Sequence, residues 1–170
     1  MDRNFTWQPF YHELANELIR WENRQQELIS FLEELRTQGF VITPLHDKDR
    51  DGARFLLNEI DPFTFFGVFN RRIGYVQRLA ILRQVKVYFK LQSELPEDLD
   101  GIPLLNNMKS WFFSGQSSRR AHDVGKLWRV FQMALAEKTR EAPAFAQACD
   151  DALTVKQTNV NLTMGLFWIR

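Results

Sequence analysis

"IDPFTFFGVFNRR" spans residues 60–72 and decides how the rest of the chain is interpreted. Four phenylalanines fall within residues 63–69, and a polar, basic triplet follows at residues 70–72. Asp61 before Pro62 is typical of a helix start, because the aspartate caps free backbone N–H groups and proline fits the first turn. We expect the phenylalanines to anchor this short helix in the core, which leaves the triplet for the surface.

Apolar residues recur at helical spacing in several other segments. They predict helices over residues 9–36, 74–91, 121–138 and 143–153. The stretch "FVITPL" at 40–45 is compatible with a short strand that Pro44 interrupts. The fold class is therefore mainly α. The sequence predicts a single helical domain over residues 1–170, with room for one small β element around residues 40–57.

Residues 46–59 imitate part of a calcium-binding loop. Asp47, Asp49 and Asp51 have the spacing of EF-hand ligands, but the last ligand position holds Asn58 where a bidentate carboxylate is needed. An acidic turn in solvent is the simpler interpretation. The three histidines are widely separated and there is one cysteine, so no zinc pattern is present either. We expect no metal and no cofactor in this segment.

Charge is unevenly distributed along a chain whose net charge is +1. Residues 1–61 hold twelve acids and seven bases, whereas residues 62–122 hold four acids and nine bases. No acid occurs between Asp61 and Glu94, so the bases there have no local partners. Three interpretations stay open: the basic segment meets an anion, the two segments pair with each other, or the charges are solvated.

Two clusters of basic and aromatic residues make the basic segment a candidate for binding DNA. Bases supply phosphate contacts, aromatic rings stack on bases, and Asn or Arg side chains reach base edges. Asn70 or Trp111 is expected to approach a base, and the others to contact phosphate. The candidate DNA-binding residues are Asn70, Arg71, Arg72, Arg83, Lys86, Lys90, Lys109, Trp111, Arg119 and Arg120.

The sequence predicts no catalytic residues. No phosphate-binding glycine motif is present, and the proximity of Ser117, His122 and Asp123 is not evidence of a triad, which is a spatial arrangement. A metal-dependent nuclease is a weaker alternative, because Asp61 has no second carboxylate near Lys86 to hold a cation.

The cellular setting follows from two further features. A single cysteine, Cys149, indicates a reducing compartment, and we expect a cytoplasmic protein. No apolar run approaches the length of a membrane span, so no membrane partner is expected.

The chain stops inside the hydrophobic run "LTMGLFWIR", so we expect a domain cut from a longer protein.

Four phrases carry a resemblance to a known family: "DPFTFFGVFNR", "RLAILRQV", "DGIPLLNNMKSWFF" and "NLTMGLFWIR". They resemble the region N-terminal to the AAA+ GTPase module in McrB-like subunits of modification-dependent (type IV) restriction systems, over roughly residues 8–170. The resemblance implies an antiphage DNA-recognition module, often for a modified cytosine. It also implies a GTPase module beyond this segment that self-assembles into a ring, and a separate McrC-like nuclease as a partner.

A protein–protein adaptor is the alternative function. In this interpretation the helical domain docks a partner subunit of the same defence complex. The acidic helix expected at 9–36 and the apolar C-terminal stretch support it.

Overall fold

Helix α3 (Pro62–Gly67) has every one of its residues buried. The carboxylate of Asp61 caps it, accepting hydrogen bonds from the backbone N–H groups of Phe63 at 2.9 Å and Thr64 at 3.0 Å. The predicted helix start is therefore confirmed. Burial raises the pKa of Asp61 to about 6, although its hydrogen bonds from Thr64 and Phe63 oppose that shift.

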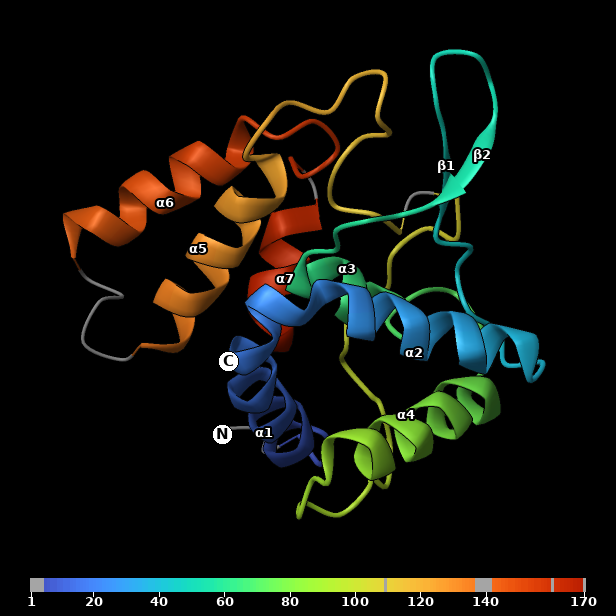
Figure 1. The fold of residues 1–170 in the computed structure, drawn as a ribbon. Coiled ribbons are helices and arrows are strands. Elements are labelled where there is room, and N and C mark those ends of the chain that lie inside the picture. Colours follow the sequence, from blue (N-terminus) through green and yellow to red (C-terminus); the bar gives the residue numbers. More distant parts are fainter. Residues whose placement is uncertain (1–4, 109, 137–141, 160, 170) are drawn as a thin grey trace.

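The computed structural model describes residues 5–108, 110–136, 142–159 and 161–169. Helices dominate it, as predicted, and the elements are arranged as Figure 1 shows. In chain order they are α1 (Gln8–Leu18), the 3-10 helix η1 (Ile19–Arg24), α2 (Gln25–Thr37), β1 (His46–Lys48), β2 (Arg54–Leu56), α3, α4 (Tyr75–Phe89), α5 (Asp123–Leu135), α6 (Pro143–Leu153) and α7 (Asn161–Trp168).

The phenylalanines of α3 join this helix to most of the others. All of them are fully buried, which confirms the prediction that they form core. Because a helix that is apolar all round must be covered on every side, its neighbours come from distant parts of the chain. Ring centroids lie 5.4–6.4 Å apart in the pairs Phe63 with Phe112 and Phe131, Phe66 with Tyr11 and Trp168, and Phe65 with Phe89.

The single helix predicted over residues 9–36 is wrong. The chain leaves helical geometry at Arg24 (φ −126°, ψ 30°), and Figure 1 shows α1 and α2 running in different directions. Gln25 explains the break, because its side chain is tied to other segments. Its Nε2 donates to the carbonyl of Glu22 at 2.9 Å, and its Oε1 accepts from the backbone N–H of Ile60 at 2.8 Å.

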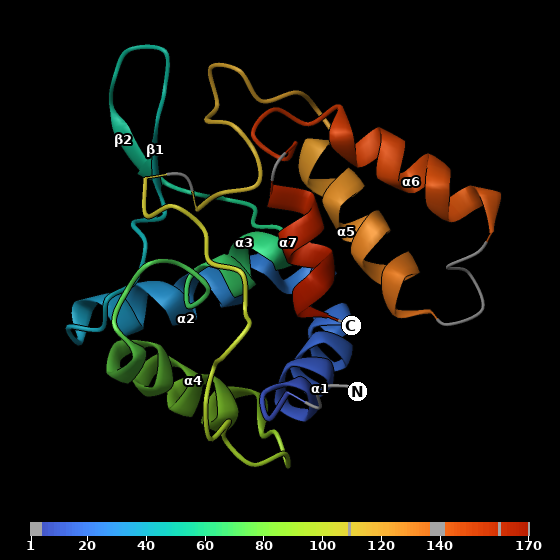
Figure 2. The same ribbon diagram turned by 180° about the vertical axis from the view of Figure 1, so that it is seen from behind.

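Strands β1 and β2 form an antiparallel hairpin within the predicted 40–57 region. Strand β1 begins at His46, directly after the "FVITPL" stretch at 40–45. Both views show the hairpin projecting from the helical body (Figures 1 and 2). Asp49, one of the aspartates with calcium-loop spacing, stabilises the turn at the tip of the hairpin. Its Oδ1 accepts hydrogen bonds from the backbone N–H groups of Asp51 at 2.9 Å and Ala53 at 2.8 Å.

The remaining predicted helices are present with adjusted limits. Helix α4 confirms the prediction at 74–91, and α6 has the predicted limits of 143–153. The helix predicted over 121–138 is the shorter α5, since Ala136 has extended backbone geometry. Helices α5 and α6 pack side by side, and α4 lies at the end of the molecule away from the hairpin (Figures 1 and 2). Among the described helices, none is long and apolar enough to cross a membrane.

Candidate nucleic-acid interface

Asn70 lies in the core, so its predicted surface position is wrong. Its Oδ1 accepts hydrogen bonds from the Tyr11 hydroxyl at 2.7 Å and from Nη2 of Arg78 at 3.1 Å. Its carbonyl accepts from the N–H of Leu105 at 2.8 Å. With no exposed area, Asn70 serves as a buried polar junction and is not available to a base.

Arg71 is also buried, contrary to the predicted surface position. Its Nε donates to the carbonyl of Val68 at 3.1 Å, and its Nη2 donates to the carbonyl of Val41 at 2.7 Å. Burial lowers the pKa of its guanidinium. Val68 follows α3 directly, so Arg71 satisfies a carbonyl that the end of this helix leaves without a helical partner.

Arg78 has a related role that sequence reasoning missed. Its Nε donates to the carbonyl of Phe69 at 2.7 Å, again just beyond α3, and burial lowers its pKa. Burial raises the pKa of Tyr11 beside it, an effect that the charge of Arg78 partly offsets. A signal was present in the sequence: Arg78 shares the helical spacing of Ile81, Leu82, Val85 and Phe89, the buried face of α4.

The bases of α4 occupy the opposite end of the molecule from the hairpin (Figures 1 and 2). Arg83 and Lys90 are exposed, whereas Nζ of Lys86 donates to the carbonyl of Ser93 at 2.6 Å. Val76 and Val87 on the same helix are 75% and 74% exposed. The outer side of α4 is therefore a mixed surface of bases and large apolar side chains.

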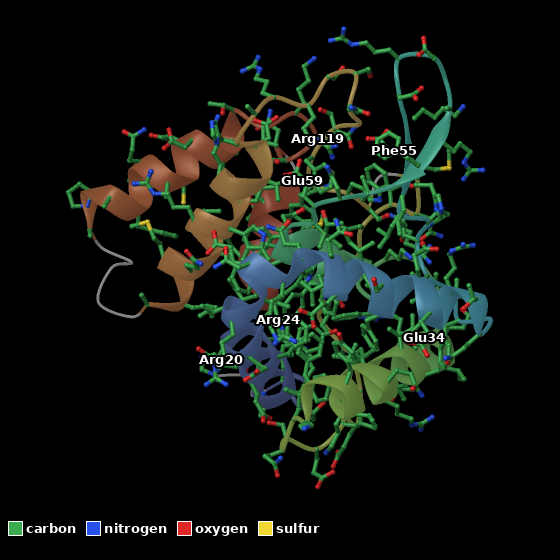
Figure 3. All side chains as sticks on the ribbon, in the orientation of Figure 1. Arg20, Arg24, Glu34, Phe55, Glu59 and Arg119 are labelled. Atoms are coloured by element: carbon green, nitrogen blue, oxygen red, sulfur yellow. The ribbon has the colours of Figure 1, made fainter. Side chains whose placement is uncertain are left out.

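Arg119 acts inside the fold. Its side chain, only 9% exposed, lies 3.2 Å from Glu59 and 3.9 Å from Asp47, with its guanidinium 5.2 Å from the ring centroid of Phe113. Figure 3 shows Arg119 and Glu59 close together, between the hairpin and helix α5. The described ion pairs thus link the basic segment to the acidic one only through Arg119. Arg120, next in the chain, is exposed.

A pocket of about 370 Å³ lies where residues 43–44, the loop 107–115 and Gln157 meet. Trp111 is partly buried in its wall and stacks on Phe113, with 5.6 Å between ring centroids. Pro44, Met108 and Gly115 also line the wall, and the rest of it is formed by hydroxyl and amide side chains. They come from Thr43, Ser110, Asn107 and Gln157.

Apart from Trp111, two predicted residues are hydrogen-bonded to pocket residues: Arg119, whose backbone N–H donates to the carbonyl of Gly115 at 2.9 Å, and Arg72. The carbonyl of Arg72 accepts a 2.8 Å hydrogen bond from Nδ2 of Asn107, a pocket residue, and the side chain of Arg72 is exposed. Lys109, also predicted, lies outside the described residues. The structure therefore places Trp111 in the pocket wall and ties the backbone of Arg72 to another pocket residue, Asn107.

Two other depressions in the described part of the chain are less suited to a polyanion. One of about 310 Å³ is lined by three acids, Glu22, Glu27 and Glu59, and by a single base, Arg24, which is paired with Glu27. One of about 280 Å³ is lined by Glu27 and Glu34. Acidic walls repel phosphate, so neither is a candidate for nucleic acid. Within the described part of the chain, no group of three or more His, Cys, Asp or Glu side chains could hold a metal ion.

Comparison with known proteins identifies a family for this fold. No curated protein and no solved structure matches the chain. The model of one domain family matches residues 7–170, which includes α3, the hairpin and every element around the pocket. The chain therefore belongs to the family described as "Domain of unknown function (DUF8425)".

Proposed function

We propose that this chain is a non-catalytic DNA-recognition module of an antiphage restriction system, and that it reads a base in the pocket around Trp111. The pocket carries this proposal. It combines an aromatic ring for stacking with amide and hydroxyl groups that hydrogen-bond base edges, which is the chemistry that sites for extruded bases use. Its volume lies at the lower end of the range of small-molecule sites, where a single base would fit.

Two exposed bases on segments next to the pocket add support. Arg72 is exposed beside Asn107, and Arg120 is exposed on the loop that follows Trp111. Exposed bases around an aromatic pocket supply the phosphate contacts that hold a strand in place. The resemblance to McrB-like N-terminal regions points to the same function, with a modified cytosine as the base. A GTPase module and a McrC-like nuclease would then complete the complex.

The test is a fluorescence anisotropy titration of duplexes with and without modified cytosine, at low and at physiological salt. Trp111→Ala should weaken binding by about 5- to 150-fold, the range that stacking of one base supplies. Tyr75→Ala on α4 is the matched control, since it removes a 44% exposed aromatic ring that does not line the pocket. Thermal melting of each variant checks that it is folded. Wild-type protein without detectable affinity at low salt would overturn the proposal.

An adaptor domain is the second candidate function, and α4 favours it. The exposed Val76 and Val87 give this helix an apolar surface of the kind that protein partners cover. The apolar C-terminal stretch no longer supports an adaptor, because Leu162 and Trp168 of α7 are buried in the core. Changing Val76 and Val87 to Ser would abolish partner docking by an adaptor and leave DNA affinity unchanged in a DNA reader.

A further inference from the structure

The hairpin of β1 and β2 has two different faces. Side chains alternate across a strand, and the register pairs Asp47 with Phe55 and Lys48 with Arg54. Asp47 and Phe55 therefore share one face, the inner face. Lys48 and Arg54 share the other, the outer face.

The inner face is fixed to the loop that carries the pocket. Oδ2 of Asp47 accepts a 2.7 Å hydrogen bond from the backbone N–H of Gln116, and Asp47 lies near Arg119. The loop comes so close that a Cβ at Gly115 would lie 2.8 Å from Oδ1 of Asp47. Thr43 and Pro44 line the pocket and are separated from β1 only by Leu45, and Gly115 of the pocket lies against Asp47, so the pocket adjoins the hairpin.

The outer face holds two cations directly opposite each other. Lys48 and Arg54 are cross-strand partners, both exposed, and Arg50 is exposed at the tip. Like charges in this position destabilise a hairpin. None of the three has an ion pair with any carboxylate among the described residues. Within the hairpin, Asp47 and Asp49 are held by backbone N–H groups, which leaves Asp51 as the exposed acid.

A pair of like charges without an ion-pair partner among the described residues is suited to an anion from outside. We propose that Lys48 and Arg54 of the outer face, with Arg50 at the tip, bind successive phosphates of the nucleic-acid strand whose base enters the Trp111 pocket. The inference rests on the proposed function and adds a second contact surface to it. Arginine binds a phosphate through paired N–H groups, and lysine adds a flexible point charge. The anchored tip holds them in place before binding, which lowers the entropy cost.

Arg54→Glu tests the proposal, because stability and binding should move in opposite directions. Placing Glu opposite Lys48 replaces a repulsive pair with an attractive one, so the melting temperature should hold or rise. DNA affinity at low salt should fall roughly tenfold or more, since a charge-assisted contact is lost. The slope of log K against log salt should shrink by about 0.9 for each phosphate contact removed.

Arg20→Glu is the matched control. It makes the same charge change at a side chain that is 76% exposed and lies at the far end of the molecule from the hairpin in Figure 3. Its surface pair with Glu17 contributes little to stability. We expect its salt slope to equal that of the wild type.

The outcomes separate this inference from the proposed function. If wild type binds DNA and Arg54→Glu keeps the wild-type slope, the hairpin proposal is overturned and the pocket proposal stands. If wild type binds no DNA, both are overturned. In that case, binding of polyglutamate that Arg54→Glu abolishes would assign the outer face to an acidic protein partner.

Discussion

The hydroxyl of Tyr11 donates a 2.7 Å hydrogen bond to Oδ1 of Asn70, joining helix α1 to the chain just beyond α3. Arg78 donates to the same oxygen from α4. Three elements that are far apart in sequence thus meet at one buried amide. Such a junction is costly to break, because each donor loses its partner where water does not reach.

Asn70→Ala should therefore destabilise the fold strongly. It leaves the Tyr11 hydroxyl and one N–H group of Arg78 unpaired, and each orphaned group costs about 1–3 kcal/mol. Urea unfolding measures the change in the free energy of unfolding. Arg72→Ala, two positions away and exposed, should change it by less than about 0.5 kcal/mol. Equal effects of the two variants would contradict the role of Asn70 as a junction.

The buried carboxyl of Asp61 should make stability depend on pH. Its folded pKa of about 6 lies above the ordinary value of 3.8, so between these values the folded state holds a proton that the unfolded state releases. Stability from this group is complete below pH 3.8 and is lost as pH rises to about 6. The loss is on the order of 3 kcal/mol, from 1.36 kcal/mol for each pH unit.

Asp61→Asn removes this titration and keeps an acceptor for the helix cap. Urea unfolding at a series of pH values from 4 to 7 should show a falling free energy for wild type and a flatter curve for the variant. Parallel curves would mean that Asp61 titrates at its ordinary pKa.

Substitution of Arg119 should lower the stability of the fold, and substitution of Arg120 should weaken DNA binding. Arg119→Ala removes the contacts with Glu59 and Asp47, so the melting temperature should fall while the salt dependence of DNA binding by the folded protein stays the same. Arg120→Ala should leave the melting temperature unchanged and reduce the salt slope by about 0.9. The reverse assignment would show that Arg119 faces the nucleic acid.

Gly67→Ala should disturb both the core and the pocket. A Cβ at Gly67 would lie 2.9 Å from Cδ1 of Leu105 and 2.9 Å from the carbonyl of Ser110, whose backbone must move to admit it. Overpacking of this kind costs about 1–3 kcal/mol. Gly125→Ala is the control: it has open space in helix α5, and should stabilise by about 0.5–1 kcal/mol. Thermal melting compares the two.

Local chemistry explains what sequence reasoning predicted correctly. A cap such as Asp61 followed by Pro62 acts within one helical turn, and the helical spacing that defines α4 or α6 lies within each segment. The break at Arg24 could not be seen in this way, because the partner that holds Gln25 is the backbone of Ile60, 35 positions later.

The candidate site shows the same limit. The sequence around Arg71 is typical of an exposed base. Its burial depends on a hydrogen bond to the carbonyl of Val41, 30 positions earlier, which no local pattern indicates. Trp111 was predicted from its type, but its pocket needs Thr43 and Gln157, which no local pattern connects. The opposed Lys48 and Arg54 require the strand register, which sequence reasoning did not supply.

Helix α3 has a consequence for how the chain melts. Its rings pack against α1, α4, α5 and α7, so none of these four helices can leave without exposing part of α3 to water. Subdomains that unfold independently need separate cores. We therefore expect one cooperative transition, with heat denaturation followed by near-ultraviolet and far-ultraviolet circular dichroism giving coincident curves.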